Sequence, residues 1–131
     1  MKKIHIPLFN DEYALNVYIG TKEELIKHGA KYLEIDEKEV KYKVNTTKGS
    51  AWNALVMDCN CNPLILINGE LDWHYSLSTL AHEACHGADY IMDYIGMVDE
   101  SGEFRAHTVG AVMRHFFKET RLKVVKSGKK R

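Results

Sequence analysis

Two histidines and a glutamate in the stretch STLAHEACHGADY, residues 78–90, have the spacing of a metal site. His82 and His86 are four residues apart, so on a helix both side chains project from one face. Imidazole nitrogens placed in this way can bind one zinc ion at about 2.0–2.1 Å. Glu83 lies about 100° round the helix from His82, where it can reach a water bound to the metal. The pattern is HExxH, in which two histidines bind zinc and the glutamate acts as general base.

Composition alone does not make this pattern rare, because the histidine and glutamate content yields it by chance in about one such chain in thirty. The context favours a metal site. The motif lies within the longest stretch of helical apolar spacing, on the face opposite its apolar side chains, and small residues flank it. The simpler alternative is a pair of polar residues on an ordinary helix face.

A catalytic zinc needs a third protein ligand and one open position. The chain has Asp89 and Met92 where the metzincin extension of the motif would place glycine and histidine, so that class is excluded. Glu103 and His107, four residues apart on the next predicted helix, are the candidates. The intervening chain can span about 23 Å when extended, which lets it double back toward His86. Spacing alone leaves both candidates open.

The elements that must position these residues follow from apolar periodicity. A helix is expected from about 74 to 95 with Gly96 as its stop, and a second helix over 102–124 after a turn. Earlier in the chain, Thr21 and Glu24 fit a capping box for a helix over 21–33. Alternating or β-branched stretches predict strands over 3–8, 14–20, 40–45, 51–58 and 63–68.

This order of elements predicts an α+β fold, with a small mixed or antiparallel sheet packed on the helix that carries the motif and on the C-terminal helix after it. The length suits one domain, residues 1–125, followed by a basic flexible tail over 126–131. From 114 to 131 there are eight Lys or Arg and one Glu, a net charge of +7. A solvated terminus is the simpler interpretation, and a nucleic-acid contact is the alternative.

The stretches TLAHEACHGADYIMDYIGM and EFRAHTVGAVMRHFF resemble small phage- and prophage-encoded zinc metallopeptidases of the gluzincin type. The resemblance covers about residues 51–117 and is strongest over 79–110. It implies a minimal zincin-like domain, with Zn²⁺ held by His82, His86 and Glu103 and with Glu83 as the base. Position 107 departs from the family pattern, in which an aromatic residue is expected, so His107 is either an oxyanion stabiliser, a partner of the ligands or a rival ligand.

The chemistry expected from such a site is peptide-bond hydrolysis. Glu83 takes a proton from the activated water and passes it to the leaving amine. His107, Tyr75 and Tyr90 are candidate donors to the oxyanion, with His107 preferred. An extended peptide substrate could add along LILIN if that strand is exposed, although its unbroken apolar run equally fits a buried central strand. Asp89 and Asp93 are either solvated charges or partners that orient a ligand histidine.

The remaining signals concern location and rival functions. The chain shows no signal-peptide core at its start and no stretch of about 18 apolar residues, so we expect a cytoplasmic protein without a membrane partner. Cys59, Cys61 and Cys85 are expected to be free thiols, since CxC lacks the usual spacing of a zinc pair. The rival function is a non-catalytic protein in which the metal is a structural staple, either a phage regulator or a nucleic-acid-binding protein that uses its basic tail.

Overall fold

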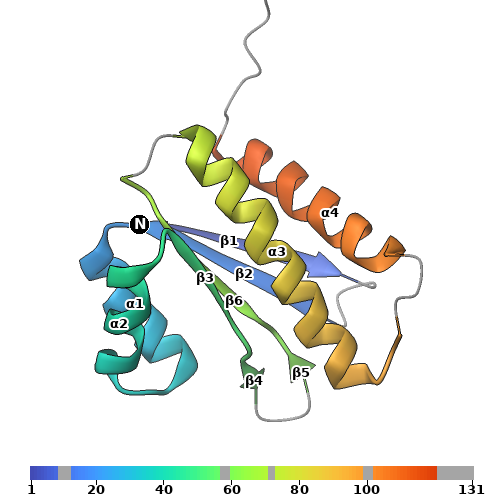
Figure 1. Cartoon of the computed structure of the whole chain (residues 1–131), viewed down its shortest axis with the longest axis horizontal. Coiled ribbons are helices and arrows are strands. Elements are labelled where there is room, and N and C mark those ends of the chain that lie inside the picture. The colour runs from blue at the N-terminus through green and yellow to red at the C-terminus, as the bar shows by residue number, and fades with distance from the viewer. Residues whose placement is uncertain (9–12, 57–59, 71–72, 99–101, 121–131) are drawn as a thin grey trace, which may run out of the picture.

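A mixed four-stranded sheet forms the centre of the computed structural model, which describes residues 1–8, 13–56, 60–70, 73–98 and 102–120. Its strands are β1 (Lys2–Leu8), β2 (Tyr13–Gly20), β3 (Gly49–Trp52) and β6 (Leu64–Asn68). They lie in the order β1-β2-β6-β3 (Figure 1). β2 runs parallel to β6, and the two outer pairs are antiparallel. The short β4 (Leu55–Val56) and β5 (Asn60–Cys61) form a separate antiparallel pair.

Helices cover both faces of this sheet. Ile65 and Ile67 of β6 belong to a core shared with α3 (Trp73–Ile95) and α4 (Glu103–Thr120), whereas Leu64 and Leu66 pack against α1 (Lys22–Leu33) and α2 (Glu37–Thr46). Figure 1 shows α3 and α4 side by side, with α1 and α2 together elsewhere on the sheet. The unbroken apolar run of β6 therefore reflects burial on two faces.

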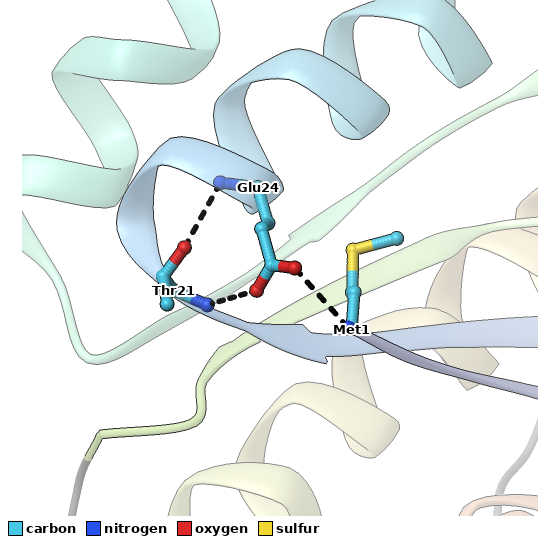
Figure 2. Close-up of polar contacts among 3 residues, drawn as sticks. All are labelled: Met1, Thr21 and Glu24. Atoms are coloured by element: carbon cyan, nitrogen blue, oxygen red, sulfur yellow. Dashed lines mark hydrogen bonds and ion pairs between the residues drawn. The ribbon is translucent and has the colours of Figure 1, made fainter.

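The first helix begins as its sequence predicts. Thr21 is the N-cap of α1, and its hydroxyl accepts the backbone N–H of Glu24 at 3.2 Å. The Glu24 carboxylate accepts the Thr21 N–H at 3.0 Å and also the Met1 amino group at 3.1 Å (Figure 2). The capping box thus joins the start of β1 to the start of α1.

The expectation of a strand over 40–45 is wrong, because these residues lie within α2. Asp36 caps the helix by accepting the Lys38 N–H at 2.8 Å. Val40 and Val44 are buried one helical turn apart, and Tyr42 between them is 70 % exposed. The alternation Val-Lys-Tyr-Lys-Val fits a strand, but the two valines also have the i, i+4 spacing of a helix.

The helix that carries the HExxH motif extends from Trp73 to Ile95, close to the expected bounds. Gly96, with φ 71°, follows it in the left-handed region that ends helices. A Cβ on Gly87 would lie 2.8 Å from Leu15 Cδ2, so glycine lets α3 approach β2 closely. The last helix starts at Glu103, one residue after the expected start at 102, and residues 121–124 of its expected range lie outside the described residues.

The other expectations have mixed outcomes. The strands over 3–8, 14–20 and 63–68 are confirmed as β1, β2 and β6. The expected strand 51–58 is divided, because β3 ends at Trp52 and β4 starts at Leu55. The α+β class and the mixed sheet are confirmed, but helices on a second face of the sheet were not expected.

Among the described residues, no helix has the length and apolarity needed to cross a membrane. The tail over 126–131 lies outside the described residues.

Candidate active site

The two histidines of the motif face one another at the surface of α3. Their Nε2 atoms are 3.2 Å apart, and the ring planes are inclined at 76°. Both residues are exposed, as expected for the face of α3 opposite its apolar side chains. Two nitrogens that bind one tetrahedral zinc at about 2.05 Å would be about 3.3 Å apart. The pair therefore has the separation that a shared metal ion requires.

Glu83 is buried beside this exposed pair, with only 8 % of its surface accessible. Its Oε2 atom lies 3.9 Å from His82 Nε2, and the backbone of Ala51 on β3 is close enough to act on the pKa of its carboxyl. Burial raises the pKa of the Glu83 carboxyl, against the opposing effects of His82, His86 and Lys43. A buried carboxyl therefore lies next to the two candidate metal ligands.

A hydrogen bond to Ala51 connects α3 to the edge of the sheet. β3 is the outermost strand on its side, and only β6 pairs with it in the four-stranded sheet. Tyr90, two helical turns after Glu83, donates its hydroxyl to the Ala51 carbonyl at 3.3 Å. Burial raises the pKa of the Tyr90 hydroxyl, and the negative charges of Glu83 and Asp89 add to the effect. The Ala51 carbonyl is thus bonded by a side chain of α3.

Glu103 and His107 are exposed on the first two turns of α4. Arg105 lies between them in sequence and faces α3, where its Nε donates to Asp89 Oδ1 at 2.7 Å. Glu103 and His107 are each two residues from Arg105, and so about 200° round the helix from it. Within the described ranges, no three His, Cys, Asp or Glu side chains form a group that could hold a metal ion. Neither candidate third ligand therefore joins the histidine pair in this arrangement.

The other candidates from the sequence have different outcomes. Asp89 forms an ion pair with Arg105 across the two helices, whereas Asp93 is exposed. The suggestion that a substrate adds along LILIN is wrong, because β6 lies between β2 and β3 and all five of its residues are buried. Cys85 is a free thiol, as expected. Cys59 and the side chains of Cys61 and Tyr75 lie outside what the structure describes.

Sequence reasoning missed two residues near the candidate base. Ala51 carries no reactive side chain, so only its backbone contact to Glu83 reveals it. Lys43 acts electrostatically on Glu83 from α2, and the wrong assignment of its segment to a strand concealed this relation.

Comparison of the chain with protein-family models, with curated proteins and with solved structures found no match.

Proposed function

We propose that this protein is a zinc-dependent metallopeptidase, a hydrolase that cleaves peptide bonds with a metal-activated water. The observation that supports this most directly is the 3.2 Å separation of the His82 and His86 Nε2 atoms beside the buried Glu83 carboxyl. The separation suits two ligands of one ion, and the burial suits a base. A purely structural site has no need of a buried carboxylate next to its histidines.

His82 and His86 would hold the metal, and Glu103 is the proposed third ligand on the basis of the gluzincin-type resemblance. Bound Zn²⁺ would supply Lewis-acid polarisation of the scissile carbonyl and lower the pKa of its water to about 7. Glu103 lies two residues before Arg105, whose ion pair with Asp89 joins this turn of α4 to α3. Asp89 lies about one helical turn after His86. Glu103 must change its orientation on metal binding to complete the ligand set.

The catalytic steps assigned to the chain itself begin with Glu83. Its carboxylate accepts a proton from the attacking water and later gives that proton to the leaving amine. Burial favours the protonated form of this carboxyl, which is the form that holds the proton between the two transfers. His107 is proposed as the donor to the oxyanion, and the Tyr90 hydroxyl is already bonded to Ala51.

The test combines metal analysis with cleavage of a peptide library. We expect the purified wild type to contain about one zinc per chain and to cleave peptides. Glu83→Gln keeps the shape of the side chain but removes the base, so zinc content should persist while kcat falls by a factor of about 10²–10⁴. His82→Ala and His86→Ala should lose both zinc and activity. A zinc-loaded wild type that cleaves no peptide would contradict the proposal.

A further inference from the structure

We propose that an open cavity of about 270 Å³ on the α1–α2 side of the sheet binds a phosphate dianion. The cavity lies where the first turn of α1, the end of α2 and the end of β6 meet. The histidine pair belongs to α3, whose apolar side chains pack on the other face of the sheet. The proposal therefore goes beyond the peptidase activity and can be tested without it.

The charge of the cavity lining favours an anion. Lys22, the first residue of α1, and Lys48, which lies between α2 and β3, both line the cavity. The described lining residues include no carboxylate, since neither Glu23 nor Glu24 of the same turn of α1 is among them. Each ammonium group ends a flexible four-carbon chain, so both can reach an anion held between them.

Asn68, the last residue of β6, supplies a third donor. It is only 9 % exposed, and it lies on the same face as Leu64 and Leu66 because alternate residues of a strand point the same way. Its Oδ1 atom accepts the Glu70 backbone N–H at 2.9 Å. Since only the oxygen of the amide can accept a hydrogen bond, this contact fixes the orientation of the amide and leaves Nδ2 as a donor.

The Asn68 Nδ2 atom has no hydrogen-bond acceptor among the described residues. Within the same part of the chain, Thr108 Oγ1 is the one side-chain polar atom that is fully enclosed and has no partner. The Asn68 Nδ2 is therefore accessible, and Asn68 lines the cavity. A buried amide thus offers its donor to the space that the two lysines border.

The end of α2 would oppose an anion if its carbonyls were bare, because the last carbonyls of a helix carry partial negative charge. The Lys43 carbonyl is the first of these. It accepts the Thr47 hydroxyl at 2.6 Å and the Thr47 backbone N–H at 2.9 Å. These two bonds reduce the negative charge that the end of α2 presents to the cavity.

A phosphate monoester matches this lining. It carries about two negative charges near neutral pH and three acceptor oxygens, and the cavity offers two ammonium groups and one amide donor. The volume is equivalent to about nine water molecules, which leaves room for a small organic part beside the phosphate. Free phosphate and a small phosphate ester share this chemistry, so both are tested.

The experiment titrates the ¹⁵N-labelled protein with glycerol 3-phosphate, with inorganic phosphate and with glycerol, and follows the Asn68 side-chain amide by NMR. We expect both phosphates to shift this signal with dissociation constants of about 10 mM or below, and glycerol to leave it unchanged. Tighter binding of glycerol 3-phosphate than of inorganic phosphate would assign the site to an ester. Equal binding would assign it to the free ion.

Two variants with a matched control locate the site. Lys22→Gln should weaken binding about 10-fold, because it removes a charged donor. Lys27→Gln removes the same charge from an exposed position of α1 outside the cavity and should change the affinity by less than about twofold. Asn68→Asp keeps the oxygen that the Glu70 N–H needs but adds a negative charge, so binding followed at the Gly69 amide should be lost.

The proposal is overturned if neither phosphate shifts the Asn68 amide, or if the shifts occur only around the histidine pair. Equal weakening by Lys22→Gln and Lys27→Gln would also overturn it, since the attraction would then come from the overall charge of α1. These two lysine variants change exposed side chains, so they decide the matter even if Asn68→Asp does not fold.

Discussion

Glu83 and its two neighbouring histidines differ in exposure although they lie within one turn of a helix. The His82 side chain is 69 % exposed, whereas that of Glu83 is 11 % exposed. The difference follows from the helix geometry, since a rotation of about 100° turns a side chain from solvent toward the edge strand β3. In the proposed site, the two histidines can thus bind a metal ion from the solvent side while Glu83 stays buried against the sheet edge.

Substitution of the two third-ligand candidates should give different results. Glu103→Gln removes a carboxylate from the proposed ligand set, so zinc affinity should fall by at least about 10-fold. His107→Asn should retain zinc and lower kcat, because this histidine is assigned to the oxyanion. Zinc affinity measured by competition with a chromophoric chelator distinguishes the two. A loss of zinc from His107→Asn with none from Glu103→Gln would exchange their roles.

The histidine pair was predictable from sequence, and the environment of the base was not. Four-residue spacing on a helix fixes the relation of His82 to His86 without any tertiary information. The contact between Glu83 and Ala51 joins residues 32 apart in the chain and depends on how β3 packs against α3. The expected approach of Glu103 relied on chain length, which shows that a contact is possible but does not orient the side chain.

Among the elements, the predicted strand at 40–45 shows how a short pattern misleads. Val40 and Val44 satisfy both the period of a strand and that of a helix. Tyr42 favoured the strand, because it continues the alternation between the two valines. The Asp36 cap and the acidic first turn with Glu37 and Glu39 favour a helix, and in the structure they begin α2. The capping box of α1 was predictable because its two partners are only three residues apart.

The capping box should give α1 a measurable pH dependence. The Thr21 N–H and the Met1 amino group lower the pKa of the Glu24 carboxyl below 4.5. A lowered folded-state pKa adds stability above the unfolded value, and this stability is lost as pH falls through the lowered pKa. Wild type should therefore be more stable than Glu24→Gln from about pH 5 to 7, with the difference shrinking toward pH 2. Urea unfolding across this range measures it.

The control for this effect is Glu23→Gln, which removes one negative charge from the same helical turn. Its stability relative to wild type should change less with pH than that of Glu24→Gln. Equal pH dependence in the two variants would show that the helix dipole, rather than the contacts to Thr21 and Met1, accounts for the effect.

On the scale of the whole molecule, stability should depend on both faces of the sheet. Leu66 is 1 % exposed and packs in the cluster formed with α1 and α2, on the side away from the histidines. Leu66→Ala should lower the free energy of unfolding by about 2–5 kcal/mol. Tyr42→Ala, at a surface position of α2, should change it by less than about 1 kcal/mol. A small effect of Leu66→Ala in urea unfolding would contradict the two-sided core.

The composition of β6 has a consequence for how the strand finds its correct alignment. In a strand with one solvent-exposed face, a shift of the pairing register by one residue turns apolar side chains to solvent and is therefore unfavourable. In β6, Leu-Ile-Leu-Ile presents apolar side chains of similar size to both faces of the sheet, so a register shift would expose little apolar surface to solvent. The alignment must instead be set where the strand enters and leaves, by bonds such as Asn16 N–H to the Pro63 carbonyl and Gly69 N–H to the Gly20 carbonyl, at 3.1 and 2.8 Å. These contacts thereby fix where β6 begins and ends, and so where the chain leaves the sheet before α3.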